Sequence, residues 1–308
     1  MTRLYRLTVL ASIVALAATA MSSVGAAQGR GFKVAFYNIR SGQGIQGLSG
    51  HTTPFAATAN CDAAQGPVNA WGAGIVQKEL ARIAGSDPAV VALGLAEAWK
   101  CGSARNVRTA LGWKQDSADR NGVALVARFG FARDPEWLQL DTTHNKNPRD
   151  TMWVVHGAVC LDARCSGTVD VYATHWSGTG PQGPGTFDRQ ARQTVEFMSK
   201  TPGPHLLIGD LNVWEGDREV CRQRPNNHTL DILRMAGYVD AWAAVHGRTE
   251  GYTGMINRNG CGQPNGYVWK RIDYAWSKGL PPRAIERFGM VPPGDPAPSD
   301  HYGILMTY

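Results

Sequence analysis

Polar residues that can bind a metal ion or move a proton recur at the ends of apolar runs along this chain. The segment HLLIGDLN at 205–212 places Asp210 and Asn212 directly after the run LLIG. Other strand-like runs carry the remaining residues of this kind: Asn38, Glu97, His175, Asp273, Asp300 and His301. Because neighbouring strands of a sheet lie side by side, we expect these groups to converge at one sheet edge.

Such a cluster would be rich in oxygen donors. Burying carboxylates together is costly unless they are paired or bound to a cation. Oxygen donors suit Mg²⁺, Mn²⁺ or Ca²⁺ better than a soft metal. Taken singly, each residue has an ordinary structural explanation: Asn38 suits a turn, and Asp210 suits a helix cap. The combination, rather than any member, predicts a metal-dependent site.

Strand-like runs outnumber helical patterns in this sequence. The runs rich in Val, Ile, Tyr and Trp are 32–39, 89–99, 121–128, 151–159, 168–176, 205–212, 267–276 and 301–308. Helical periodicity is found at 68–85, 186–200 and 226–237. Short turns between several adjacent strands favour antiparallel or mixed sheets. The pattern predicts an α+β fold with two sheets flanked by helices.

The N-terminal segment reads as a targeting sequence. Two arginines precede a short apolar run and a stretch of small residues, which is typical of a secretory signal peptide over residues 1–27. Cleavage after Ala27 fits the pattern, with Ala20 as an alternative. No later run is long enough to cross a membrane. We expect one domain over 28–308 in a secreted or periplasmic monomer, and no protein partner is inferred.

Six cysteines in the predicted mature chain indicate three disulfides. Cys160 and Cys165 flank a four-residue turn between two strand-like runs, so a hairpin bridge is expected. Of the fifteen connectivities open to six cysteines, we favour the additional pairs Cys221–Cys261 and Cys61–Cys101. No Cys/His spacing favours a zinc site.

The net charge is mildly basic. Removing Arg3 and Arg6 with the predicted signal peptide lowers it from +6 to +4. This value is compatible with a polyanionic partner and equally with a solvated basic surface.

The motifs in this order resemble the endonuclease/exonuclease/phosphatase superfamily, which shares the DNase I-like fold. They are FYNIR with Asn38, LAEAW with Glu97, ATHWSG with His175, IGDLNVW with Asp210 and Asn212, YTG with Thr253, RIDYAW with Asp273, and PSDHYGI with Asp300 and His301. The resemblance covers about residues 32–308. It implies a four-layer αββα sandwich, made of two mixed β-sheets flanked by helices, with a metal-dependent hydrolytic site.

The resemblance also implies metal-binding roles. Glu97 would be the main metal ligand, with Asn38 beside it and Asp300 contributing nearby. Mg²⁺ is the expected ion, with Mn²⁺ or Ca²⁺ as alternatives.

It further implies catalytic roles for four residues. His301 would be the general base, and Asp273 would hold it in the right tautomer. His175 would bind the scissile phosphate or protonate the leaving oxygen. Asp210, together with Asn212, would position the phosphate, the water or a second ion. In-line attack at phosphorus needs a base on one side and a proton donor or cation on the other, which this set provides.

The sequence departs from the family in two places. The carboxylate that often supports the first histidine is not obvious, and Asp116 and Asp119 are the candidates. Trp99 and Lys100 follow Glu97 where some nucleases carry an arginine.

Nucleic acid is the favoured substrate. Arg218, Arg222, Arg224, Lys270 and Arg271 could contact backbone phosphates. The tryptophans Trp176, Trp214 and Trp269 flank motif residues and either stack on bases or pack in the core. We expect Thr253 and Asn212 to contact substrate as well. A sphingomyelinase-like enzyme acting on an anionic or choline lipid is the alternative, and it would need an exposed apolar hairpin. A non-catalytic binding protein is disfavoured because the catalytic residues are all present.

Overall fold

The computed structural model of this protein describes residues 31–42, 44, 74–142, 151–177, 185–216, 225–254, 270–291 and 297–308. The predicted signal peptide lies outside these residues, as do Cys61, Cys221 and Cys261. Within the described part of the chain, no helix combines the length and hydropathy of a membrane span.

The first sheet has six strands in the order β11-β12-β1-β2-β4-β3. Their bounds are β1 Lys33–Asn38, β2 Val90–Ala96, β3 Gln115–Asp116, β4 Ala124–Ala127, β11 Ala284–Phe288 and β12 Gly303–Thr307. The neighbours β1 and β2 run parallel, whereas β1 and β12 run antiparallel. The sheet therefore joins the two ends of the described chain and is mixed.

The second sheet has the order β5-β6-β7-β8-β10-β9. Its strands are β5 Glu136–Leu140, β6 Met152–Cys160, β7 Thr168–His175, β8 His205–Asp210, β9 Val239–Asp240 and β10 Asp273–Lys278. Here β7 and β8 are parallel, and β10 lies antiparallel to β8. Both sheets thus place a parallel pair near their centre.

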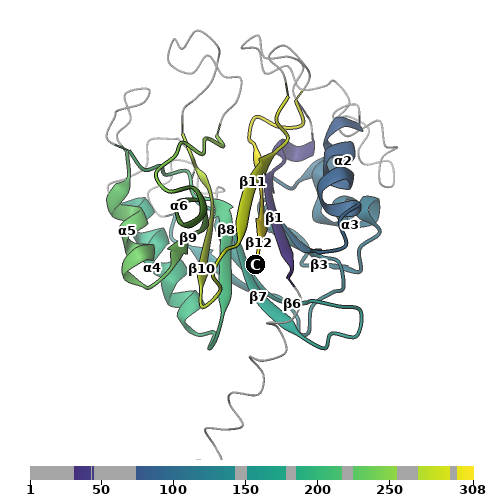
Figure 1. The fold of residues 1–308 in the computed structure, drawn as a ribbon, viewed down its shortest axis with the longest axis horizontal. Coiled ribbons are helices and arrows are strands. Elements are labelled where there is room, and N and C mark those ends of the chain that lie inside the picture. Colours follow the sequence, from purple (N-terminus) through teal and green to yellow (C-terminus); the bar gives the residue numbers. More distant parts are fainter. Residues whose placement is uncertain are drawn as a thin grey trace, which may run out of the picture.

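Helices cover the outer faces of the two sheets (Figure 1). The helices α2 Ile75–Leu80 and α3 Ala104–Leu111 lie on one side, and α4 Thr186–Ser199 and α5 Asn227–Met235 lie on the other. The short helix α6 Ala241–His246 packs beside β10 and β11. This arrangement is the predicted αββα sandwich.

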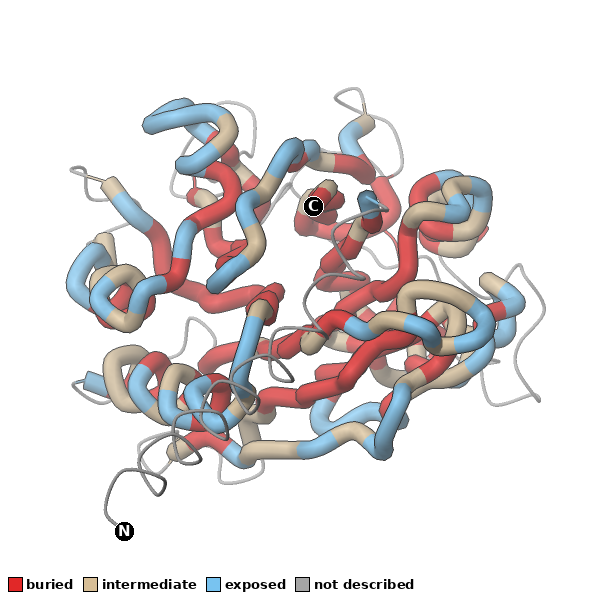
Figure 2. The backbone as a smooth tube through the Cα atoms, turned by 60° about the horizontal axis from the view of Figure 1, so that its bottom comes forward, coloured by how far each residue is buried: buried red, intermediate tan, exposed pale blue. Residues whose placement is uncertain are grey.

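The central strands are apolar on both faces because both faces are covered. Val34 and Phe36 of β1 pack between the two sheets, whereas Ala35 and Tyr37 pack under the first helical layer. In β8, Ile208 faces the space between the sheets and Leu207 faces the second helical layer. A strand with two covered faces must bury both sets of side chains. Figure 2 shows the resulting buried centre beneath more exposed helices.

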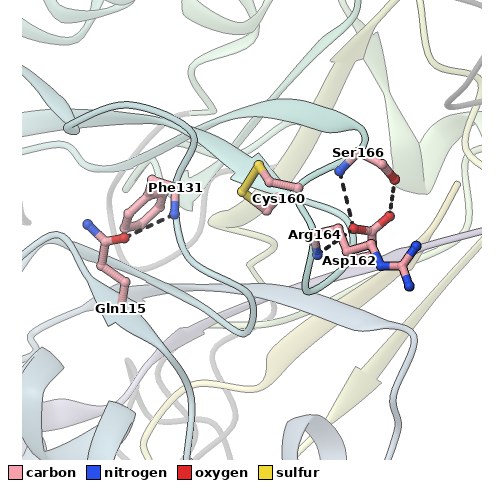
Figure 3. Close-up of a disulfide and its surroundings, with 7 residues drawn as sticks. Gln115, Phe131, Cys160, Asp162, Arg164 and Ser166 are labelled. Atoms are coloured by element: carbon pink, nitrogen blue, oxygen red, sulfur yellow. Dashed lines mark hydrogen bonds between the residues drawn. A yellow bond between two sulfur atoms is a disulfide. The ribbon is translucent and has the colours of Figure 1, made fainter.

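The predicted hairpin disulfide is confirmed. Cys160 ends β6 and is bonded to Cys165 in the turn that leads to β7. Asp162 closes the turn by accepting hydrogen bonds from the backbone of Arg164 and from Ser166 (Figure 3). Cys101 is also disulfide-bonded. The predicted pairs Cys61–Cys101 and Cys221–Cys261 each involve residues outside the described part of the chain.

Several elements differ from the sequence predictions. The strands β5 and β11 were not predicted, because their exposed positions dilute the apolar signal. The described part of the helix predicted at 68–85 begins at Ile75 and ends in a π-helical turn over Ala81–Gly85. Residues 186–199 and 227–235 form helices close to the predicted bounds.

Candidate active site

The register of three neighbouring strands brings the catalytic candidates together. His175 ends β7 and pairs with Asp210, the last residue of β8. Asp210 in turn pairs with Asp273, the first residue of β10. Parallel pairing of β7 with β8 and antiparallel pairing of β8 with β10 places two strand ends and one strand start at the same edge of the sheet. Residues separated by about 100 positions therefore become lateral neighbours.

Asp210 lies at the centre of the cluster. Its Oδ2 atom accepts a hydrogen bond from Asn38 Nδ2 at 3.0 Å. The same oxygen lies 3.5 Å from His175 Nε2 and 3.8 Å from His301 Nε2. Its Oδ1 accepts from the backbone N–H of Asn212 at 3.0 Å. One buried carboxylate thus faces both histidines, and its position is fixed by two hydrogen bonds.

His301 and Asp273 form a buried pair. His301 Nδ1 lies 2.9 Å from Asp273 Oδ2, and both residues are almost fully buried. Burial alone would lower the pKa of His301, but the Asp273 carboxylate raises it well above its usual value. Burial raises the pKa of Asp273 to about 6, although the charge of His301 acts in the opposite direction. With Nδ1–H donating to Asp273, Nε2 is left to face Asp210 and the reacting groups.

Thr253 supports this pair from behind. Its hydroxyl oxygen accepts hydrogen bonds from the backbone N–H groups of Ile272 and Asp273, at 3.1 and 2.9 Å. Its own carbonyl accepts from Tyr302, the residue after His301. Thr253 is 1% exposed. These contacts make Thr253 a positioning residue for the His301–Asp273 pair.

The residues predicted to bind metal lie beside this centre. Asn38 Nδ2 lies 3.3 Å from Glu97 Oε1, and the Asn38 carbonyl accepts a hydrogen bond from Ser299, next to Asp300. Asp300 Oδ1 is buried and has no hydrogen-bond partner among the described residues. A buried carboxylate oxygen without a hydrogen-bond partner fits a hard divalent cation. Ligand atoms of Asp210, Asp273 and His301 also lie within 4.8 Å of one another.

Asn38 is oriented differently from a metal ligand. Its amide nitrogen faces the carboxylates of Glu97 and Asp210, and its Oδ1 accepts from the backbone of Arg40 at 3.2 Å. Asn38 therefore links the Glu97 and Asp210 sides of the site by hydrogen bonds. Its oxygen would have to turn inward to bind a cation.

The backbone is strained where it carries these groups. Positive φ angles are found at Arg40 (45°), Ser41 (58°), Glu97 (53°) and Asn212 (52°). Residues with side chains adopt this region rarely, and such strain tends to be retained at functional sites. All four lie directly after a central strand, where the chain bends to present its side chains.

Arg40 is a site residue that the sequence analysis did not single out. Its Nε lies 3.9 Å from Asp300 Oδ2, and its Nη1 is buried without a hydrogen-bond partner among the described residues. A guanidinium group held with an unused buried donor is suited to bind an anion. Its position two residues after Asn38 in the motif FYNIR was the available signal.

Several proposed substrate contacts are engaged elsewhere. Trp176 is fully buried and Trp214 is 5% exposed, so neither ring offers a face on which a base could stack. Trp176, predicted to contact substrate, packs in the core beneath α4 and α5. Arg271 forms a two-pronged ion pair with Asp240, with both distances 2.7 Å. Trp269, Arg218, Arg222 and Arg224 lie outside the described residues.

Neither carboxylate suggested as a partner for His175 takes that position. Asp116 pairs with Arg108 at 2.8 Å. Asp119 accepts a hydrogen bond from the backbone of Ala104. Among the described residues, Asp210 is the carboxylate recorded beside His175.

The fold and the site define the class of this protein. The model of the Endonuclease/Exonuclease/phosphatase family matches residues 37–301, and the chain belongs to this family. Members of this family hydrolyse phosphate esters, so a phosphoesterase activity is supported.

Solved structures show the same fold at low sequence identity. The endonuclease/exonuclease/phosphatase from Beutenbergia cavernae DSM 12333 matches with a TM-score of 0.62 and 18% identity, covering 90% of this chain and 71% of that one. A humanized TDP2 of D. rerio matches at 0.55 and 15%, covering 90% and 98%. The mannosyl-6-phosphatase Bt3783 of Bacteroides thetaiotaomicron also matches at 0.55 and 15%, covering 89% and 98%. No curated protein matches this sequence.

Proposed function

We propose that this protein is a divalent-metal-dependent phosphodiesterase that hydrolyses nucleic acid by means of water activated at His301. The observation that carries the proposal is the buried His301–Asp273 pair at 2.9 Å, whose free nitrogen faces Asp210. On the other side of Asp210, His175 presents its own Nε2. Two imidazoles flanking one carboxylate give an acid and a base at a single site.

His301 takes the proton from water. Asp273 holds the Nδ1–H, so the lone pair of Nε2 is directed at the reacting water, and the carboxylate stabilises the imidazolium that forms. Thr253 fixes the backbone at Asp273, which keeps the histidine in this orientation. The proton removed in this step is held at Nε2.

His175 acts on the opposite side of the phosphate. Its Nε2 protonates the leaving oxygen or donates a hydrogen bond to a non-bridging oxygen. Asp210 lies beside both imidazoles and helps to orient them. Arg40 contacts the phosphate through its unused Nη1, and Asn212 contributes its remaining amide hydrogen. Arg40 thus takes the role of the arginine that the sequence lacks after Glu97.

Glu97 and Asp300 would hold the cation, with Asn38 beside them. When bound, the cation supplies positive charge that offsets the charge of the phosphate and favours the neutral form of His301. Mg²⁺ fits the oxygen donors, with Mn²⁺ or Ca²⁺ as alternatives.

Nucleic acid is proposed as the substrate from features of this chain. The fold itself does not decide, because D. rerio TDP2 is described in complex with a single-strand DNA product whereas Bt3783 is described as a mannosyl-6-phosphatase. The net charge of the predicted mature chain is positive, which favours a polyanion. Among the described residues, the large exposed apolar side chains are Met235, Val239 and Met290, and they form no apolar hairpin for a lipid surface. We also propose that the enzyme is secreted as a monomer.

A substrate panel tests this proposal. Linear and plasmid DNA, RNA, sphingomyelin vesicles and a sugar monophosphate are incubated with Mg²⁺, Mn²⁺, Ca²⁺ or chelator. We expect cleavage of nucleic acid that the chelator abolishes. His301→Ala should lower kcat by about 10²–10⁴-fold, because it deletes the base. Hydrolysis of vesicles without any cleavage of nucleic acid would instead favour the lipid phosphodiesterase.

A further inference from the structure

An arginine outside the described catalytic cluster lies against two tryptophan rings. The guanidinium carbon of Arg120 lies 5.0 Å from the ring centre of Trp137 and 4.8 Å from that of Trp153. The two rings meet edge to face at 6.3 Å. Trp153 Nε1 donates to Thr151 Oγ1 at 3.0 Å, which fixes that ring. Stacking against aromatic rings orients the flat guanidinium and leaves its N–H edge available.

Arg120 has no carboxylate partner in the described part of the chain. Its neighbour Asp119 is directed to the backbone of Ala104 at the start of α3. Arg120 is exposed, and among the described residues its guanidinium group contacts the two tryptophan rings. Several other arginines, among them Arg108, Arg133, Arg189 and Arg234, pair with an acid. Within the described residues, the charge of Arg120 is therefore not compensated by an acid, and two aromatic rings contact its guanidinium group.

The turn that carries Arg120 is strained and anchored on both sides. Asn121 and Gly122 have φ angles of 46° and 79°. Gly122 accepts a hydrogen bond from Ala98, and a Cβ at Gly122 would lie 2.9 Å from the Cα atom of Glu97. Asn121 donates to the carbonyl of Thr151 at 2.6 Å. The turn thus bridges the Glu97 segment and the start of β6, and strain of this kind is retained where a structure fixes it for a use.

The same turn lies beside the catalytic edge of the second sheet. Trp153 on β6 is the register partner of His175 on β7, so their side chains lie on one face of the sheet. With strands about 4.8 Å apart and Arg120 stacked on Trp153, the guanidinium lies on the order of 10 Å from His175. If the scissile phosphate of a nucleic acid strand lies at His175, a neighbouring phosphate of the same strand would lie near Arg120.

We propose that Arg120, held by Trp137 and Trp153, is a subsite for a backbone phosphate that flanks the scissile phosphate on the His175 side. The inference rests on the proposed nuclease function and names one contact by which a strand is held. The guanidinium edge donates to the phosphate oxygens, while the tryptophans keep it from folding away.

Arg120→Gln tests the subsite, with Arg164→Gln as the matched control. Arg164 is exposed in the turn at the opposite end of the β6–β7 hairpin (Figure 3). Each variant loses one positive charge, and the two differ in where that charge is lost. The substrates are a single-stranded oligonucleotide and bis(p-nitrophenyl) phosphate, which has no flanking phosphate. For Arg120→Gln we expect KM for the oligonucleotide to rise about tenfold, and the loss on the small ester to stay under about twofold. The Arg164 variant should match wild type on both.

A binding measurement separates this inference from the function it rests on. Oligonucleotide binding is followed in chelator by anisotropy at several salt concentrations. For Arg120→Gln the slope of log K against log salt should fall by about 0.7–1. Wild-type cleavage with an unchanged KM and salt slope in this variant would overturn the subsite and leave the nuclease standing. Hydrolysis of the small ester without oligonucleotide binding or cleavage by wild type would overturn both. A thermal melt checks folding. If Arg120→Gln does not fold, Arg120→Lys, which keeps the charge but loses the flat donor edge, is compared with wild type by KM for the oligonucleotide instead of by salt slope.

Discussion

At the scale of single residues, the site depends on the Asp210 carboxylate, which lies within reach of several side chains. Asp210 Oδ2 accepts a hydrogen bond from Asn38 and lies within 3.8 Å of the Nε2 atoms of His175 and His301. Glu97 is placed differently, since its side chain is partly exposed. Among the described residues, it accepts a side-chain hydrogen bond from Asn38. A partly exposed carboxylate at the edge of a buried polar cluster can bind an incoming cation without first losing a protein partner.

Glu97→Gln tests this role at the residue scale. The change keeps the shape of the side chain but removes one negative charge, so we expect the metal concentration for half-maximal activity to rise on the order of tenfold. Titration of activity with Mg²⁺ measures this, and Glu196→Gln on the exposed face of α4 serves as the charge-matched control. An unchanged metal requirement in the Glu97 variant would remove Glu97 from the metal site.

At the scale of elements, the site depends on the pairing of β7, β8 and β10. The strand β8 supplies Asp210 and lies between the strands that supply His175 and Asp273. Close approach of β7 and β8 is permitted by Gly209, where an added Cβ would lie 2.5 Å from the carbonyl oxygen of Thr174. Because that atom belongs to the backbone, the strands themselves would have to separate.

Gly209→Ala should therefore damage both stability and activity. We expect a loss of about 1–3 kcal/mol in the free energy of unfolding, from overpacking between two backbones. A displaced Asp210 should also lower kcat by at least about tenfold, since small misplacement of catalytic groups is costly. Denaturant unfolding and steady-state kinetics measure the two effects. Gly167→Ala, whose Cβ would meet only Leu161 at 3.6 Å, should change neither.

At the scale of the whole molecule, a further buried histidine lies at the other end of β8. His205 is 2% exposed, with Nδ1 2.8 Å from the Gly203 carbonyl and Nε2 2.7 Å from the Tyr238 hydroxyl. Burial lowers the pKa of His205, although the contact with Gly203 acts in the opposite direction. The neutral ring satisfies both partners, since Nδ1–H donates and Nε2 accepts.

The lowered pKa predicts a pH dependence of stability. A histidine whose folded pKa lies below its unfolded value of about 6.5 binds protons more readily in the unfolded chain. Its stabilising contribution is complete above that value and is lost as the pH falls from about 6.5 towards the folded pKa. Unfolding free energies of wild type and His205→Gln between pH 8 and 5 check this. The wild type should lose more stability than the variant over this range, and parallel curves would contradict the prediction.

The sequence predicted which polar residues lie together, because each motif combines a strand with its terminal polar residue. Asn38, His175, Asp210, Asp273 and His301 are joined by contacts of 3.8 Å or less, directly or through one another. The sequence predicted substrate contacts at Trp176 and Thr253, and the structure buries both residues among supporting contacts. The types of these residues are equally compatible with either role. What they touch depends on elements far away in the chain.

The amino-acid sequence by itself determined the chemistry available to this protein and the alternation that makes its strands apolar on both faces. These properties follow from residue type and from the two-residue period of a strand. Only the tertiary structure decided which charges remain unpaired. Arg271 is neutralised by Asp240 from a different segment, whereas Arg120 is held by two rings without an acid among the described residues. Whether two charged side chains form an ion pair depends on the distance between them. For segments that are remote in the sequence, strand register and packing set that distance.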